Sequence, residues 1–529
     1  RVDKSLAVKE AGGAGMVLVN VSPNSINADF HFVPTVHLPD TARAGLKAYA
    51  SGANPTAKID LATLVYNVPA PLTAAFSSRG PLVAGGGDVL KPDLIAPGQD
   101  ILAAVAPPAN AGRSFNLYSG TSMSAPHVAG LAALLRNGHP DWSPMMIKSA
   151  LMTTGTDVLD AGTPAPNTNP VLIFRQGAGH VAPTQAADAG LVYDSGFEDW
   201  LAFLCGTTNG VAPAVCNLLK NLGYSLDPSD LNMASIAIGD LSGAQTVTRT
   251  VTNVSSRRST YTANVTGLAG MTVSVNPSSL RIAPGHSKSF TVTFTRTTAA
   301  IGAYAGGQLT WSDTTHTVRS PIVILPKALA TPVEVSSAGG PITYNVRFGY
   351  SGAFTATPRG VIPATAAPGS VADDPLDTFD PAGPGVASFP ITIAPGTTYA
   401  RFSLFDANVA PASDLDLYVY RGATLVAAST NGTSREEANI LAPAPGSYTV
   451  YVHGFSVPGT ADFTLFSWLL GSDPAGNMAV SAPVSAVNGT TGSIGLTFSG
   501  LTPGTKYLGS VVYGGTTSLP NPTLVRVDP

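Results

Sequence analysis

From about residue 235 to the end of the chain, apolar and β-branched residues alternate with polar ones in short runs separated by Asn, Gly, Pro and Ser, as in "TVTRTVTNVS" and "SFTVTFTRT". A period of two is typical of strands with one buried face. Residues 1–192 differ, because "SMSAPHVAGLAALLRNG" and "SPMMIKSALMTTG" have apolar residues at helical spacing. The sequence therefore predicts an α/β part followed by all-β modules. In the α/β part we expect strands at "TAKIDL" (56–61) and "KPDLIAPG" (91–98), and a helix that is capped by Ser143 and starts at Pro144.

Length and composition narrow the classes of protein that fit. The 529 residues exceed what one core usually holds, so we expect several domains. The net charge of −4 gives no basic field, which argues against nucleic acid as a partner. No apolar run approaches the length of a membrane span. The histidines are scattered and no acidic loop has calcium-site spacing, so we expect no metal and no cofactor.

The last two hundred residues contain three sets of strands. Residues 332–362 and 478–527 each offer too few strands for a stable sandwich, while 375–470 carry a strand series of their own. One reading is a single β-sandwich split in sequence by an inserted β-domain, and the other is three consecutive β-modules. We favour the split form, because the ends of an inserted domain often lie close together.

Two cysteines, Cys205 and Cys216, are the complete set in the chain. A disulfide between them suits an oxidising compartment, and two buried free thiols are the alternative. A bond requires the α-carbons to lie within about 7 Å of each other.

The segment "SGTSM" at 119–123 makes Ser122 a candidate nucleophile. Gly120 permits a tight turn, small neighbours leave space above the serine, and the helix that follows directs unpaired N–H groups toward it. A backbone N–H beside a nucleophile is one half of an oxyanion hole. From these residues alone, the alternative that Ser122 only caps the helix is the stronger one.

A longer match reverses that preference. "SGTSMSAPHVAGLAALL" resembles the nucleophile segment of subtilases, the subtilisin-like serine proteases, and "FSSRGP", "KPDLIAPGQDILAA" and "HPDWSPMMIKSALMTT" resemble neighbouring segments in the same order. "GAGHVAPTQAADAGLVYDSGFEDWLAFLC" is similar to the plant-type branch, where it leads to a fibronectin type III-like sandwich. "DLDLYVYR" and "APAPGSYTVYVHG" look like bacterial pre-peptidase C-terminal domains.

This resemblance implies a partial subtilisin-like parallel-sheet α/β catalytic domain followed by β-sandwich modules. The expected domains are the end of a protease-associated domain (1–62), the end of the catalytic domain (63–200), a linker with the disulfide (201–234), a fibronectin type III-like sandwich (235–326), a split sandwich (327–370 and 472–529) and an inserted pre-peptidase C-terminal-like domain (371–471).

The resemblance makes Ser122 the catalytic nucleophile and its backbone N–H part of the oxyanion hole. The catalytic Asp and His and the oxyanion Asn of the family precede the protease-associated insert, so we expect an N-terminally truncated fragment that is inactive alone. His127 belongs to the "PHVAG" helix, Asp194 is interpreted as a turn residue, and His453 lies in the inserted domain. The remaining histidines lack a supporting pattern: His31, His37, His139, His180, His286 and His316.

Two hypotheses follow. The first is a secreted endopeptidase acting on proteins or peptides through an acyl-enzyme on Ser122. The second is a non-catalytic secreted protein that uses its C-terminal β-modules for adhesion or binding. Alternation places Asp414 and Asp416 on one strand face, which we interpret as a solvated face. Substrate preference and oligomeric state do not follow from the sequence.

Overall fold

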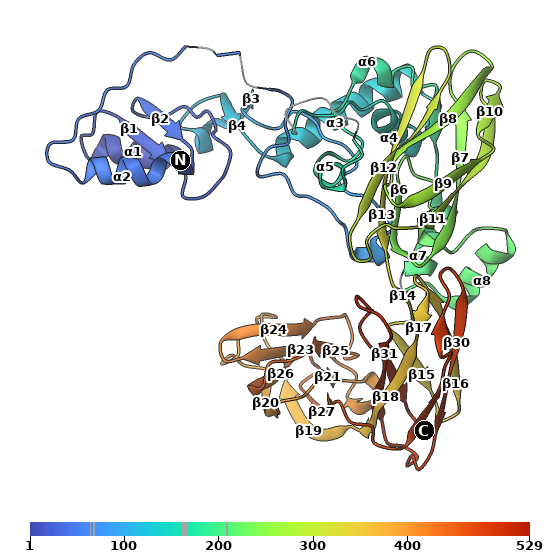
Figure 1. Ribbon diagram of the computed structural model, residues 1–529. Helices are drawn as coiled ribbons and strands as arrows, with labels where there is room; N and C mark the ends of the chain where they lie inside the picture. Colours follow the sequence, from blue (N-terminus) through green and yellow to red (C-terminus); the bar gives the residue numbers. More distant parts are fainter. Residues whose placement is uncertain (64, 67–68, 161–166, 208–209) are drawn as a thin grey trace. The chain divides into compact units, whose positions relative to one another are not determined.

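The computed structural model describes residues 1–63, 65–66, 69–160, 167–207 and 210–529 (Figure 1). The chain divides into two compact units, Arg1–Pro326 and Lys327–Pro529, and each is described by itself.

The first unit begins with a small α/β segment. It contains α1 (Val2–Glu10), β1 (Met16–Val19), β2 (Thr35–Leu38), η1 (Asp40–Ala42) and α2 (Arg43–Ala50), and β1 and β2 pair in parallel. The prediction of a further strand at "TAKIDL" (56–61) is wrong: none of its residues is in a strand, and Leu61 is 96% exposed. A strand needs a paired neighbour, which no described residue supplies there.

A second segment leads from the α/β segment to the sandwich. Its elements are η2 (Ala84–Gly87), β3 (Ile101–Ala104), η3 (Pro107–Asn110), β4 (Phe115–Tyr118), α3 (Thr121–Gly138), α4 (Pro144–Thr153), α5 (Pro170–Gln176) and α6 (Pro183–Ala186). The strands β3 and β4 form an antiparallel hairpin. The strand expected at "KPDLIAPG" (91–98) is reduced to a parallel bridge between Ile95 and His180. As predicted, α4 begins at Pro144 after Ser143, whose hydroxyl accepts the N–H of Met146 at 3.0 Å.

The disulfide joins two short helices, α7 (Phe197–Thr207) and α8 (Pro213–Asn221). The sulfur atoms of Cys205 and Cys216 are bonded, and their α-carbons are 5.7 Å apart. The region described from the sequence as a linker is thus helical.

The first unit ends in a β-sandwich, and the single-turn helix η4 (Pro228–Asp230) precedes its strand β6. One sheet has the order β10-β8-β12-β13-β6 and the other β5-β7-β11-β9. The strands are β5 (Leu191–Tyr193), β6 (Ile236–Leu241), β7 (Ala244–Asn253), β8 (Ser259–Gly267), β9 (Met271–Asn276), β10 (Ser279–Ile282), β11 (Ser287–Arg296), β12 (Ala305–Ser312) and β13 (Thr317–Pro326). Residues 191–193 therefore join the sandwich although the sequence placed them earlier.

The sandwich is held together by large buried side chains and is joined to the preceding segment. Trp311 and Phe290 are at most 1% exposed and their rings meet edge to face at 4.9 Å. At the junction, the Asp88 carboxylate accepts the N–H of Gly239 in β6 at 2.9 Å. Burial raises the pKa of Asp88 to about 6.

In the second unit, strands from its first part (329–363) and from its last part (478–527) pair in the same two sheets. Their orders are β14-β16-β30-β28 and β15-β32-β31-β18, and β17 pairs with β29. The strands are β14 (Leu329–Ala330), β15 (Glu334–Ser337), β16 (Ile342–Phe348), β17 (Gly352–Ala353), β18 (Thr355–Pro363), β28 (Met478–Ser481), β29 (Ser485–Ala486), β30 (Thr491–Phe498), β31 (Tyr507–Gly514) and β32 (Thr523–Val527).

Residues 365–470 pair among themselves in two further sheets, β19-β27-β21-β25 and β20-β26-β23-β24, with β22 beside β27. The strands are β19 (Thr365–Ala372), β20 (Val386–Ile393), β21 (Tyr399–Ser403), β22 (Val409–Ala410), β23 (Asp414–Arg421), β24 (Thr424–Ser429), β25 (Glu437–Leu441), β26 (Gly446–Ser456) and β27 (Thr460–Leu470); η5 (Asp406–Asn408) precedes β22. We call residues 365–470 the insert. It starts at Thr365 because β19 pairs with β27, earlier than the sequence-based boundary at 371.

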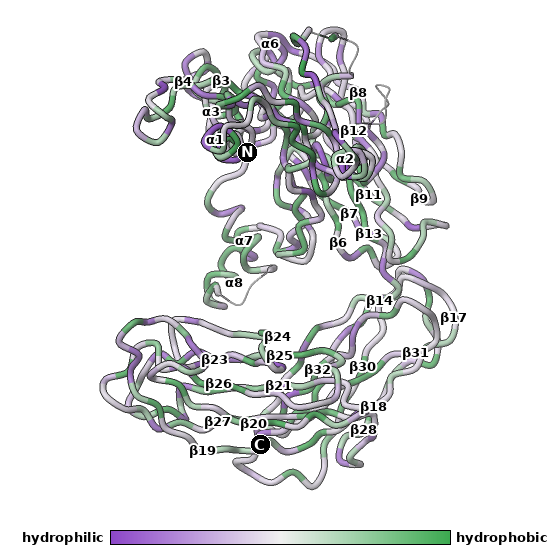
Figure 2. The backbone as a smooth tube through the Cα atoms, turned by 90° about the vertical axis from the view of Figure 1, so that its left-hand side faces the viewer, coloured by the Kyte–Doolittle hydropathy of each residue, from purple (hydrophilic) through white to green (hydrophobic). Residues whose placement is uncertain are grey.

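The insert leaves and rejoins the surrounding sandwich at one place. The N–H of Val361 donates to Asn477 Oδ1 at 3.0 Å, and Asn477 Nδ2 donates back to the Val361 carbonyl at 2.9 Å. Gly360 forms a bridge with Pro474. Figure 2, coloured by hydropathy, lets the alternation of hydrophobic and hydrophilic residues be followed along these strands.

Candidate active site around Ser122

Ser122 lies at a strand–turn–helix junction. The strand β4 ends at Tyr118, Gly120 is the N-cap residue, and α3 begins at Thr121. Ser122 is thus the second residue of the helix, and its side chain is exposed. The small residues of "SGTSM" let the strand turn directly into the helix.

Ser122 does not cap α3. The N-cap position is Gly120, without a side-chain capping bond, and within the described chain the Ser122 hydroxyl has no hydrogen-bond partner. Its N–H belongs to the first helical turn, where a helix supplies no acceptor of its own. A free hydroxyl beside a free N–H is the arrangement that a nucleophile with half an oxyanion hole requires.

The first turn of α3 is fixed by close packing on residues 96–98. The N–H of Gly120 donates to the Gly98 carbonyl at 2.8 Å, and the Ser124 hydroxyl donates to the Ala96 carbonyl at 3.0 Å. A β-carbon on Gly98 would lie 2.1 Å from Ser124 Oγ. Glycine at 98 is what lets the two segments approach.

Asp100 ties the same turn to the N-terminal segment. Its N–H donates to Ser119 Oγ at 2.8 Å, and Ser119 Oγ donates to Asp100 Oδ1 at 3.0 Å. The N–H of Ala28 donates to that carboxylate oxygen as well, at 2.9 Å. The backbone immediately before Ser122 is therefore held from two sides.

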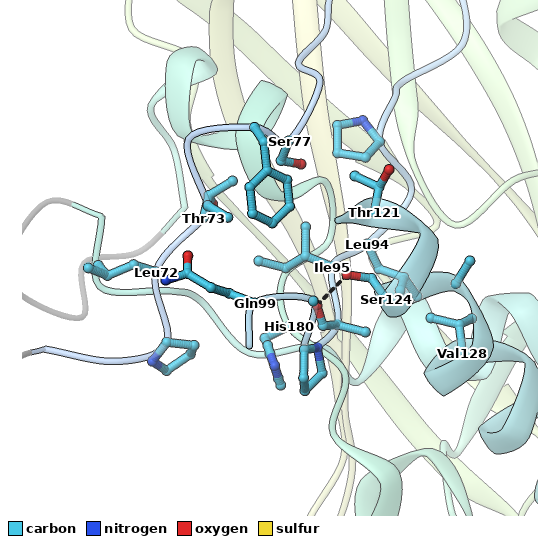
Figure 3. A pocket seen from close by; sticks show the side chains of 18 of the residues that line it. Leu72, Thr73, Ser77, Leu94, Ile95, Gln99, Thr121, Ser124, Val128 and His180 are labelled. Carbon is cyan, nitrogen blue, oxygen red and sulfur yellow. Dashed lines mark hydrogen bonds between the residues drawn. The ribbon is translucent and has the colours of Figure 1, made fainter. Parts of the chain in front are cut away.

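A cavity of about 710 Å³ opens beside α3 (Figure 3). The helix contributes Thr121, Ser124, Ala125 and Val128 to its lining. Ser122 is not among the lining residues, so the cavity lies against a different face of the helix. Two loops complete the wall with apolar residues that include Leu72, Phe76, Leu94, Ile95 and Pro97.

Among the described residues, no histidine is hydrogen-bonded to Ser122. His127 is exposed, and its Nδ1 lies 2.8 Å from the carbonyl oxygen of Met123 in the same helix. His180 lines the cavity, with Nδ1 3.0 Å from the Val181 carbonyl oxygen. No sequence pattern predicts that His180 lies near α3, because its position there depends on its bridge to Ile95.

The other acid and base candidates have structural partners elsewhere. Asp194 accepts the Ser143 hydroxyl at 2.5 Å and so fixes the residue that caps α4. His453 lies in the insert between Asp374 and Asp416. The interpretation of Asp416 as solvated is wrong: it is 5% exposed, since the histidine covers it.

Comparison with known proteins gives this junction its context. Residues 25–179 match the family model described as the subtilase family, and residues 230–324 match that of a fibronectin type-III domain. This chain carries a subtilase domain followed by a fibronectin type-III domain.

Relatives that match include subtilisin-like proteases of Arabidopsis thaliana. The chain is 43% identical to SBT1.7 over 353 residues, covering 61% of this chain and 46% of the relative. It is 40% identical to SBT1.3 over 351 residues, covering 61% and 44%. The chain therefore spans less than half the length of these relatives. A tripeptidyl peptidase 2 structure aligns with a TM-score of 0.23 at 11% identity over 77% of this chain and 46% of its own, which supports no fold assignment.

The helix α3, which lies within the residues that match the subtilase family, is unusually exposed for its sequence. Of the 18 residues of α3, Leu135 alone is buried, and Leu134 is 69% exposed. Between Ala125 and Leu135 its single polar residue is His127, and a helical segment that is apolar all round is normally surrounded by protein. The described part of the subtilase domain thus supplies only some of the neighbours that α3 requires.

Neither the subtilase domain nor the modules after it contain, in the described ranges, a group of three His, Cys, Asp or Glu side chains able to hold a metal ion. In the same ranges no helix is both long and apolar enough to cross a membrane.

Proposed function

We propose that Ser122 is the nucleophile of a subtilisin-like serine endopeptidase. The observation that carries the proposal is the free hydroxyl and first-turn N–H of Ser122 at the start of α3. In this reaction Ser122 Oγ attacks the peptide carbonyl and gives its proton to a base, and the Ser122 N–H stabilises the oxyanion. The base then protonates the leaving amine, and water hydrolyses the acyl-enzyme.

The base, its orienting Asp and the oxyanion Asn come, in this proposal, from polypeptide outside the 529 residues. Two facts support this. No described histidine bonds to Ser122, and the chain spans 46% of its relative SBT1.7. The exposed apolar surface of α3 and the cavity beside it would then be covered by that polypeptide. The 529 residues alone are inactive.

The proposed location is extracellular. A disulfide closes the hairpin of α7 and α8, and such bonds persist in oxidising compartments. The substrates in this proposal are proteins or peptides outside the cell.

A serine-directed fluorophosphonate probe tests the proposal. We expect no labelling of the isolated chain, because Ser122 lacks a base, and labelling after addition of the N-terminal half of a homologous subtilase. S122A should abolish that labelling. S124A should keep it, because Ser124, two residues further along α3, donates its hydroxyl to the Ala96 carbonyl and is not the proposed nucleophile. Labelling of the isolated chain at Ser122 would overturn the proposal that the base lies outside the 529 residues. Labelling of the complex at another serine of this chain would overturn the assignment of Ser122 as the nucleophile.

A further inference from the structure

The two sheets of the insert have different surroundings within the second unit, because one of them packs against the surrounding sandwich. Outward residues of β21 and β27, namely Tyr399, Phe466 and Trp468, form a cluster with Leu508 and Leu524 of the surrounding sandwich. The facing sheet β20-β26-β23-β24 contributes its inner residues to the core of the insert. Within the second unit, the opposite side of that sheet is not part of either cluster.

This opposite side is rich in aromatic residues. Along β23 the inward residues Leu415, Leu417 and Val419 are fully buried, which turns Tyr418 and Tyr420 outward. Tyr451 of β26 lies across from Tyr418, and its ring is 5.6 Å from that of Tyr420. We call Tyr418, Tyr420 and Tyr451 the outer tyrosine face; each is partly exposed.

An acidic loop, residues 373–380, is pinned onto this face. His453 Nε2 lies 2.9 Å from Asp374 Oδ2, and His453 Nδ1 lies 3.4 Å from Asp416 Oδ2. The Asp374 carboxylate also accepts the N–H of Leu376 at 3.0 Å. Phe379, from the same loop, stacks on Tyr418 with ring centres 3.9 Å apart. The loop and the tyrosines therefore form one ordered surface.

The charge of the insert is strongly unbalanced. Residues 365–470 contain ten Asp and Glu, three Arg and no Lys, whereas the whole chain has 32 acidic and 28 basic residues. Asp373, Asp377 and Asp380 of the loop are exposed. Arg421, at the far end of β23, is engaged with the Pro445 carbonyl at 3.1 Å. The surface thus combines aromatic rings with unbalanced negative charge.

We propose that the outer tyrosine face and the 373–380 loop bind an extended polypeptide segment rich in Arg and Lys. Guanidinium and ammonium groups stack on tyrosine rings, and the exposed carboxylates attract the same cations. This site is independent of Ser122 and of the proposed protease activity. In the proposal it brings basic proteins to the C-terminal part of the molecule.

Fluorescence anisotropy with a fluorescein-labelled nona-arginine peptide and the full chain tests this. We expect binding that D377N/D380N weakens about five- to tenfold, because two exposed charges are lost from the loop. Asn is tolerated at 377, where φ is +49°, so the fold should persist. Y451T should weaken binding about two- to fivefold by removing one ring.

Matched controls carry the same chemical changes elsewhere. D462N/D473N removes two exposed charges of the second unit that belong neither to the loop nor to the tyrosine face, and Y66T removes a tyrosine that is 89% exposed in the first unit. Both controls should bind as the unaltered chain does. Equal weakening by the two Asp pairs would overturn the proposal in favour of unspecific charge attraction. Absence of binding by the unaltered chain, or tighter binding to a neutral polysaccharide than to the peptide, would also overturn it.

Discussion

The helix α3 and the fibronectin type-III sandwich are both built from apolar sequence, yet their surroundings differ sharply. In the sandwich, strand alternation places Trp311, Phe290 and Phe294 at no more than 1% exposure. In α3, one residue of 18 is buried. The core of the sandwich is enclosed by residues of this chain, whereas most side chains of α3 are exposed among the described residues. Apolar sequence alone therefore does not show that a region is buried among the described residues of this chain.

Removing a large apolar side chain from each region should show the difference in burial between them most clearly. W311A should destabilise the sandwich by about 3–5 kcal/mol, because it leaves a cavity in a closed core. L134A, on the exposed side of α3, should change stability by less than about 0.5 kcal/mol. Urea unfolding of the two variants measures both effects. A large loss with L134A would show that α3 is already covered in the isolated chain.

The next effect concerns the few contacts that do hold α3. G98A places a β-carbon against Ser124 Oγ and should destabilise the first turn by about 1–3 kcal/mol. Hydrogen exchange of residues 119–125 should rise, while that of the sandwich strands stays unchanged. G98A/S124A should recover part of the loss, since the clashing oxygen is removed. No recovery would locate the strain at the Gly120 carbonyl, 2.9 Å from the same β-carbon.

The smallest effect is a pH dependence where Asp88, in the segment that precedes the sandwich, contacts strand β6. Burial raises the pKa of Asp88 to about 6, above the ordinary value of 3.8 for an aspartate. The folded state therefore binds this proton more tightly, and the resulting stability is full below pH 3.8 and is lost as pH rises through 6. Protection of the β6 amides, corrected for intrinsic exchange, should be greater at pH 5 than at pH 7. D88N should remove this difference; its persistence would assign the effect to another group.

Local patterns predicted the local elements well. Periodicity and capping residues located α3 and α4, and Ser143 and Pro144 start the latter as expected. The errors lie where pairing is non-local. The segment 56–61 has strand-like residues but no partner, and 91–98 keeps one bridge. A strand pattern describes a residue's preference, and only a neighbour far along the chain makes it a strand.

The candidate site shows the same limit. The residues around Ser122 pointed to a turn into a helix, but whether its hydroxyl capped that helix depended on the position of Gly120. The burial of Asp416 depended on His453, 37 residues away on a neighbouring strand. Neither the cavity beside α3 nor the outer tyrosine face follows from any one segment, because each joins residues from several.

The paired hydrogen bonds between Val361 and Asn477 join the host sandwich just before and just after the insert, so the insert is a separable module. Both connections of the insert start beside these hydrogen bonds, which hold the host strands on either side in place without contacts from the insert. A chain lacking residues 365–470 would need only a short turn to continue from β18 to β28. Gain, loss or exchange of such a module in a lineage requires no redesign of the sandwich that carries it.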